Sequence, residues 1–119
     1  MDVIKYLKDN IKGIFIEESL EDSNIYYATT IKSDYEIKMQ IEFYDDLSFC
    51  CLTCWMLDSD DIQVTEDVVI YDENEIELIL EFVNTIPKIY NKVTNNLNSL
   101  IELCNDNNLD IEQILSSML

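Results

Sequence analysis

The fold is decided by residues 35–57, which read YEIKMQIEFYDDLSFCCLTCWML. The first nine residues alternate apolar and polar side chains, which is the period of a strand with one buried and one wet face. A tight turn at Asp45-Asp46 follows. The next run, Leu47–Leu57, is apolar on both faces, which is typical of a central strand covered by helix on at least one side. The stretch therefore predicts an antiparallel hairpin at the centre of a sheet.

The residues before this hairpin predict one helix and two strands. Asp2 is placed to cap a short helix with an apolar stripe over residues 3–11, and Gly13 stands where a helix stop is expected. Residues 14–17 form the first predicted strand. Residues 25–31 are rich in β-branched and aromatic side chains and form the second.

The residues after the hairpin predict an edge strand and a long helix. One short strand is expected within residues 62–71. Asp72 and Glu75 have the spacing of a capping box, and apolar residues then recur at intervals of three and four over residues 76–104. Pro87 removes one helical hydrogen bond. Because the apolar phase passes through it unbroken, one kinked helix is favoured over two separate helices.

The last residues predict one more helix, and all the predicted elements together define a fold class. Asp110 with Gln113 suggests a cap for a short final helix. The predicted fold class is α+β: a four- or five-stranded antiparallel meander, with an N-terminal helix, a long kinked C-terminal helix and the short final helix packed on one face. One domain is expected over residues 1–119, and the uncovered face of the sheet is expected to be wet and acidic.

The charge of the chain is far from neutral. It has 25 acidic residues, seven lysines, no arginine and no histidine, for a net charge of -18. Residues 17–81 alone carry 19 acids and two lysines, a net of -17. Such a field repels nucleic acid and anionic membranes and attracts basic surfaces. The chain has neither an apolar run of membrane-spanning length nor a signal-peptide layout, so a cytoplasmic location with reduced cysteines is expected.

The residue types argue against an enzyme. Without histidine, the commonest general base and zinc ligand are missing, and one glycine does not make a phosphate-binding loop. A hydrolase would need a buried carboxyl group with a raised pKa, whereas the carboxylate pairs Glu17-Glu18, Asp45-Asp46 and Glu66-Asp67 are expected in turns or at strand ends, where water solvates them. No catalytic residue is therefore predicted.

No metal site and no cofactor is predicted either. In a strand, Cys51 and Cys54 point to opposite faces, and Cys50 and Cys54 lie about 13 Å apart by strand rise. Buried apolar cysteines are the favoured interpretation, with metal or redox chemistry as the alternative. The acidic run Asp58-Ser59-Asp60-Asp61 begins like a calcium loop, but Ile62 stands at the fifth position. A solvated acidic loop is favoured, with weak divalent-ion binding as the alternative.

Two surfaces are predicted to bind other proteins. Carboxylates of the sheet half, with two tyrosines as anchors, form the expected partner-binding set: Glu17, Glu18, Asp45, Asp46, Asp58, Asp60, Asp61, Glu66, Asp67, Tyr26 and Tyr44. The long helix is longer than a small sheet needs, so Tyr90, Val93, Leu97 and Leu100 form an expected homodimer interface. Folding back of the final helix is the alternative cover for that stripe.

These observations favour binding over catalysis. The leading hypothesis is a non-enzymatic acidic inhibitor that blocks a basic, nucleic-acid-binding partner such as a nuclease by imitating phosphates. In size and acidity the chain resembles, as a class, phage-encoded anti-defence (anti-CRISPR-like) inhibitors and the immunity proteins of nuclease toxins. The alternative is a secretion-chaperone-like or adaptor domain that binds an extended peptide as a dimer. A small-ligand sensor is a third interpretation. Reversing the charges of Asp58, Asp60 and Asp61 is expected to abolish partner binding and leave the fold intact.

Overall fold

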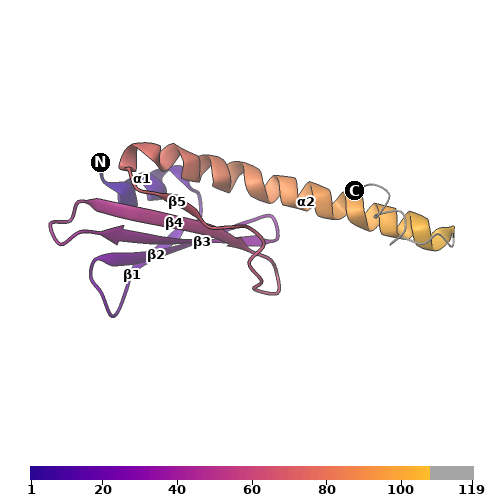
Figure 1. Ribbon diagram of the computed structural model, residues 1–119, viewed down its shortest axis with the longest axis horizontal. Coiled ribbons are helices and arrows are strands. Elements are labelled where there is room, and N and C mark those ends of the chain that lie inside the picture. The colour runs from indigo at the N-terminus through magenta and orange to yellow at the C-terminus, as the bar shows by residue number, and fades with distance from the viewer. Residues whose placement is uncertain (108–119) are drawn as a thin grey trace. The chain divides into compact units, whose positions relative to one another are not determined.

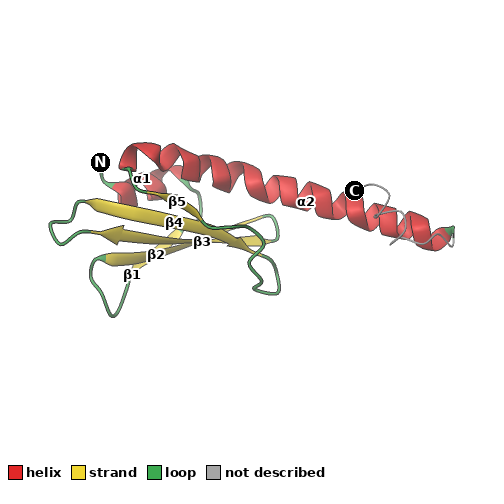
Figure 2. Ribbon diagram, in the orientation of Figure 1, coloured by secondary structure: helices red, strands yellow, loops and turns green. Residues whose placement is uncertain are grey.

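The computed structural model of the protein describes residues 1–107. Its elements are α1 (Val3–Asn10), β1 (Phe15–Glu18), β2 (Ile25–Lys32), β3 (Tyr35–Phe43), β4 (Phe49–Leu57), β5 (Val68–Ile70), the 3₁₀ turn η1 (Glu73–Glu75) and α2 (Ile76–Asp106) (Figures 1 and 2). The predicted α+β class is confirmed: an antiparallel meander, expected with four or five strands, has five and follows a short helix and precedes a long one in the chain. The predicted final helix, from Asp110 onward, lies outside the described residues.

The five strands follow one another across the sheet in chain order, each antiparallel to the next. The turn between β2 and β3 is tight, with Lys32 opposite Tyr35 and Ser33 at φ 57°. A positive φ at this place is usual in two-residue hairpin turns. The register of β3 against β4 shifts between Glu42 and Phe43, which face Cys51 and Phe49. Cys50 is therefore the extra residue of a β-bulge.

The turn between β3 and β4 is longer than predicted. The backbone N–H of Leu47 donates to the carbonyl of Tyr44 (2.8 Å), and that of Tyr44 donates to the carbonyl of Ser48 (2.9 Å). Leu47 has φ 67° and is exposed, so it belongs to the turn. The prediction that the central strand begins at Leu47 is wrong, because β4 begins at Phe49.

Both helices begin at the caps that the sequence predicts. The Asp2 carboxylate accepts a hydrogen bond from the backbone N–H of Lys5 (3.1 Å), and Gly13 after α1 has φ 77°. The Asp72 carboxylate accepts from the backbone N–H of Asn74 (2.9 Å) at the start of η1. The chain then continues as α2 through Pro87. A single helix is confirmed, while the kink at Pro87 stays a prediction.

The chain divides into two compact units, Met1–Pro87 and Lys88–Leu119. They are described separately, and the single domain stays a prediction. The core of the first unit lies between one face of the sheet and the apolar stripes of α1 and the first turns of α2. Its buried side chains are Val3, Leu7, Ile11, Ala28, Ile37, Met39, Ile41, Leu52, Cys54, Met56, Ile70, Ile76, Ile79, Phe82 and Val83. Within the described residues, no helix has both the length and the apolar character of a membrane span.

The open face of the sheet, opposite the core, differs from the prediction. By the strand register its charged residues are Glu17, Glu36, Glu42 and Lys38, and Lys38 pairs with Glu36 (3.0 Å). Its other side chains are neutral or apolar: Phe15, Ile25, Tyr27, Thr29, Ile31, Gln40, Cys51, Thr53, Trp55, Leu57 and Val69. The prediction of an acidic face is therefore wrong.

Candidate functional site

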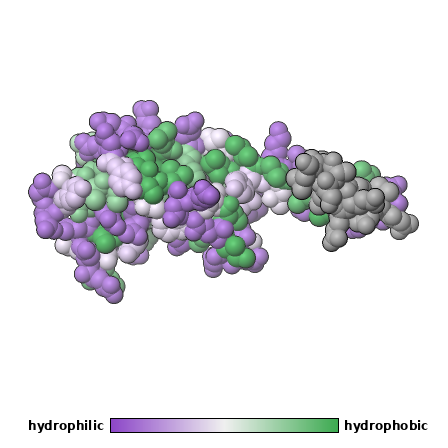
Figure 3. Space-filling model, viewed as in Figure 1, coloured by the Kyte–Doolittle hydropathy of each residue, from purple (hydrophilic) through white to green (hydrophobic). Residues whose placement is uncertain are grey.

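The acidic residues of the first unit gather at the two ends of the sheet. We call one end the pocket end, formed by the loops 19–24 and 44–48 and the segment 71–75, and the other the opposite end, formed by the turn 33–34 and the loop 58–67. Nine-residue strands separate the two ends by about 30 Å at the usual rise. Figure 3 shows hydrophilic side chains over these loops.

The predicted partner-binding residues are consequently divided between the two ends of the sheet. Glu18, Tyr44, Asp45 and Asp46 lie at the pocket end, where Asn24 Nδ2 donates to Asp45 Oδ1 (2.7 Å) and joins two of the loops. The other end carries five of the predicted acids: Asp58, Asp60, Asp61, Glu66 and Asp67. The structure does not bring these residues together into one acidic surface.

One of the two tyrosines predicted to contact a partner lies on the core side of the sheet. Tyr26 stands opposite Ile41 on the core side of the sheet, half-buried, with its ring edge-on to Phe43 (5.7 Å between centroids). Its neighbour Tyr27, opposite Gln40, is the exposed tyrosine of the open face. Tyr26 is thus a packing residue, whereas Tyr44 is 58% exposed and remains available to a partner.

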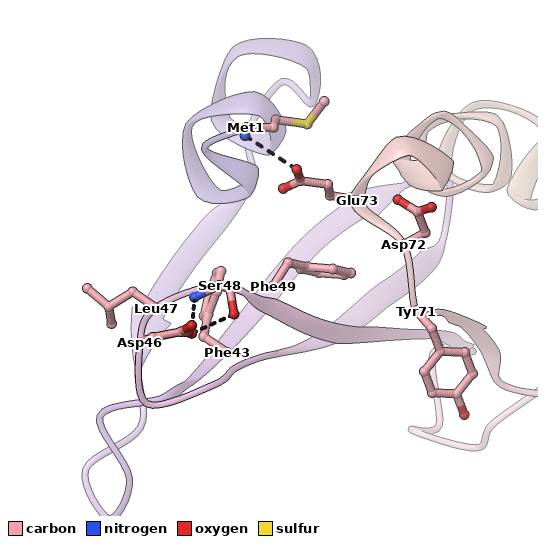
Figure 4. A pocket seen from close by; sticks show the side chains of 9 residues that line it. All are labelled: Met1, Phe43, Asp46, Leu47, Ser48, Phe49, Tyr71, Asp72 and Glu73. Carbon is pink, nitrogen blue, oxygen red and sulfur yellow. Dashed lines mark hydrogen bonds and ion pairs between the residues drawn. The ribbon is translucent and has the colours of Figure 1, made fainter.

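The pocket end contains a cavity of 580 Å³ between the β3–β4 turn and the segment that leads into η1 (Figure 4). Such a volume lies within the range of roughly 300–1,000 Å³ that is usual for ligand pockets. The rings of Phe43 and Phe49 pack edge to face at 6.3 Å between centroids. The complete lining is Met1, Phe43, Asp46, Leu47, Ser48, Phe49, Tyr71, Asp72 and Glu73. We call this cavity the aromatic–acidic pocket.

The carboxylates of the aromatic–acidic pocket are held in place by local bonds. Asp46 accepts from both the hydroxyl and the backbone N–H of Ser48, and these bonds lower the pKa of its carboxyl group. Asp72 is fixed as the cap of η1. Glu73 lies 3.5 Å from the amino group of Met1. The pocket thus presents anchored negative groups beside aromatic surface.

The loop at the opposite end is organised by one aspartate. The Asp58 carboxylate is half-buried and accepts hydrogen bonds from the backbone N–H groups of Asp60 (2.9 Å) and Ile62 (3.0 Å). Asp61 has φ 59°, and Gln63 Nε2 donates to Asp67 (2.8 Å). These hydrogen bonds fix the conformation of the loop, and Asp58 accepts two of them. From these bonds we expect that reversing the charge of Asp58 disturbs the loop, whereas the sequence alone predicts that the fold stays intact.

Few of the carboxylates are neutralised by cations. Residues 1–87 contain 21 acids and five lysines. Among the described residues, the ion pairs are those of Glu36 with Lys38 and of Glu73 with the Met1 amine. No lysine occurs in residues 18–24, 44–48 or 71–75. The loops of the pocket end therefore contain no lysine, and the cation beside them is the Met1 amine, whereas Lys32 lies beside the turn at the other end.

A second group of reactive side chains lies on the open face, close to the pocket end. Ligand atoms of Glu42, Cys50 and Cys51 all lie within 4.8 Å of one another, and Cys51 Sγ donates to Glu42 Oε2 (3.5 Å). Burial, followed by the charge of Glu42, raises the pKa of Cys51 to about 12. Sequence reasoning missed this group because it compared each cysteine with Cys54 in a regular strand, whereas the bulge places two adjacent cysteines together.

Two apolar surfaces are further candidates for binding sites. A groove of 280 Å³ beside β5 is lined by Val68, Leu78, Glu81, Phe82, Thr85 and Ile86. Figure 3 shows apolar side chains gathered over β5 and the start of α2. In the second unit, Val93 is 60% and Leu97 42% exposed, while Tyr90 and Leu100 are partly covered. The dimer interface assigned to these four residues stays a prediction.

Comparison with protein-family models, with curated proteins and with solved structures gave no match to this chain.

Proposed function

We propose that this protein is a non-enzymatic inhibitor that binds a basic, nucleic-acid-binding partner, such as a nuclease, and that the aromatic–acidic pocket is its principal contact. The single observation that carries the proposal is that Asp46, Asp72 and Glu73 line a cavity together with the aromatic side chains of Phe43 and Phe49. Acidity alone would serve solubility, whereas acids around an aromatic cavity favour recognition of a cation.

The pocket suits an arginine or a lysine side chain of the partner. The apolar stem of either residue can pack against aromatic rings while its charged group reaches neighbouring carboxylates. A guanidinium also stacks on aromatic rings and forms paired hydrogen bonds with carboxylates. Because Asp46 and Asp72 are already held by backbone N–H groups, little side-chain entropy is lost when a cation arrives.

The surrounding acidic loops extend the contact beyond one side chain. Glu18, Asp22, Asp45 and Glu75 belong to the pocket end and carry no nearby lysine in sequence. Spaced carboxylates on a rigid scaffold can occupy the lysines and arginines that otherwise hold phosphates. The partner then cannot bind nucleic acid, and the complex weakens as salt rises.

The test begins with capture of the partner. The full chain is immobilised and exposed to lysate of the source cells at low and at high salt, and the retained protein is identified. We expect a basic nucleic-acid-binding protein that is released at high salt. The captured protein is then loaded with labelled nucleic acid, which the full chain should displace. Simultaneous binding of nucleic acid and this chain would refute the inhibitor role.

Two matched variants show where the partner binds. The pocket variant Asp46→Asn, Asp72→Asn, Glu73→Gln and the opposite-end variant Asp60→Asn, Asp61→Asn, Glu66→Gln each remove three charges. Asparagine caps a helix about as well as aspartate, so the Asp72 cap survives. Asparagine also tolerates the positive φ of Asp61. We expect displacement to fail only with the pocket variant.

A second candidate function is favoured by the groove beside β5. This strand has three residues and is the last of the sheet, paired with β4 alone. An extended peptide can add to such an edge and place apolar side chains in a neighbouring groove. For this function, binding of an unfolded protein should be insensitive to salt and lost in Leu78→Lys. The control Ile62→Lys alters another exposed apolar residue, at the opposite end (59% exposed, against 49% for Leu78).

A further inference from the structure

We propose that Glu42, Cys50 and Cys51 form a binding site for a thiophilic divalent cation of the zinc class. The inference begins with the bulge in β4. In an unbroken strand, Cys50 and Cys51 would point to opposite faces. The register shift opposite Glu42 and Phe43 makes Cys50 an extra residue, and the two sulfurs and a Glu42 oxygen then lie within 4.8 Å of one another.

The separations suit a small tetrahedral ion. Zinc binds thiolate sulfur at about 2.3 Å and carboxylate oxygen at about 2.0–2.2 Å, which places neighbouring ligand atoms about 3.5–3.8 Å apart. Cys51 Sγ and Glu42 Oε2 are already 3.5 Å apart. Rotation of the half-buried Cys50 and Cys51 side chains is enough to close the remaining distance, because neither is packed in the core.

Neighbouring side chains orient the ligands. Gln40 Nε2 donates to Glu42 Oε1 (2.7 Å), so this oxygen is occupied and Oε2 is left facing Cys51. Such support of a ligating carboxylate is usual around metal ions. Tyr44 follows the β3 strand of Glu42, and the influence of Cys50 on its hydroxyl group places the two residues near each other. A water molecule can supply the fourth ligand.

The donor set determines the class of ion. Two thiolates and one carboxylate favour zinc and similar soft cations over magnesium and calcium, which prefer oxygen ligands alone. Thiols must lose their protons to bind, so binding releases protons and weakens at low pH. The site lies on the open face of the sheet, apart from the carboxylates that line the aromatic–acidic pocket.

The experiment measures zinc binding by the full, reduced chain against a chromophoric chelator. The variant Cys50→Ser, Cys51→Ser is compared with Cys54→Ala, Cys104→Ala, which keeps the proposed site and also leaves two thiols. Cys54 and Cys104 are buried, so circular dichroism verifies the fold, and single Cys50→Ser and Cys51→Ser variants are measured as well. Glu42→Gln tests the carboxylate.

We expect one zinc ion per chain in the wild type and in the Cys54, Cys104 variant. Loss of an outer hydrogen-bond partner typically weakens metal binding about 10–100-fold, so loss of either thiolate should weaken it by more than about tenfold. Cadmium should give a thiolate charge-transfer absorption that depends on Cys50 and Cys51. Equal zinc affinity in the Cys50, Cys51 variant, or displacement of zinc by excess magnesium, would show an adventitious ion only and overturn the proposal.

Discussion

Substitution of Asp58 tests whether the carboxylate of this residue stabilises the loop 58–67. In Asp58→Ala, the backbone N–H groups of Asp60 and Ile62 lose the carboxylate that accepts their bonds at 2.9 and 3.0 Å. Loss of a capping side chain costs about 0.5–2 kcal/mol. Because Asp58 is half-buried and serves two donors, we expect a loss of about 1–2 kcal/mol in the free energy of unfolding.

This loss is large enough to measure by thermal unfolding. One kcal/mol lowers Tm by about 4–8 °C in a domain of 60–100 residues, and the first unit spans residues 1–87. We therefore expect Tm to fall by about 4–16 °C in Asp58→Ala, as followed by circular dichroism. Asp58→Asn keeps an acceptor oxygen and should stay within about 0.5 kcal/mol of the wild type.

Asp60→Ala is the matched control, since it removes an equal charge from the same loop. Within residues 1–107, the structure gives the Asp60 carboxylate no hydrogen bond, and exposed substitutions of this kind usually stay within about 0.5 kcal/mol. If Asp58→Ala and Asp60→Ala unfold at the same temperature, the carboxylate of Asp58 does not hold the loop together, and the reasoning is refuted.

Three further predictions concern the core, alkaline pH and self-association. Thr30 has a buried hydroxyl group with no hydrogen-bond partner among the described residues, so Thr30→Val should stabilise the protein by about 1 kcal/mol in denaturant unfolding; a destabilised variant would contradict this. Burial raises the pKa of Cys54 to about 12 from an ordinary 9.0. Above pH 9 the unfolded chain loses this proton first, so the free energy of unfolding should fall by up to about 1.4 kcal/mol per pH unit until about pH 12. The fall should be less steep in Cys54→Ala, and equal slopes would contradict burial of the Cys54 thiol as the cause. Val93→Glu with Leu97→Glu should convert a dimer into a monomer in sedimentation, whereas Asn95→Glu should not; equal masses for both variants would refute the predicted interface.

The sequence predicts the elements best where period and caps agree. The strand 35–43 alternates without exception, and Asp2, Gly13 and Asp72 mark helix boundaries by local chemistry. The sequence predicts the start of β4 wrongly, because Leu47 is apolar and continues the apolar run, yet its φ of 67° belongs to the turn. Hydropathy carries no information about that angle.

The candidate sites depend on contacts that no local pattern reveals. Tyr26 and Tyr27 are adjacent and identical, so only the register against Ile41 and Gln40 decides which one is exposed. The bulge at Cys50 lies in a stretch that is apolar on both faces, where alternation gives no signal. The aromatic–acidic pocket joins the β3–β4 turn to residues 71–73, which are distant in the chain.

The most direct test of the proposed pocket is the affinity of an arginine-rich peptide for the two matched triple variants at physiological salt. The ends of the sheet are about 30 Å apart, well beyond the Debye length of about 8 Å, so three distant charges contribute little to a contact at the pocket. Exposed ion pairs contribute about 0.2–1 kcal/mol each. We therefore predict that the Asp46, Asp72, Glu73 variant binds the peptide roughly tenfold more weakly than the wild type, while the Asp60, Asp61, Glu66 variant is nearly unchanged. Equal weakening of both variants would contradict the account, because it would show that net charge and not the pocket attracts the peptide.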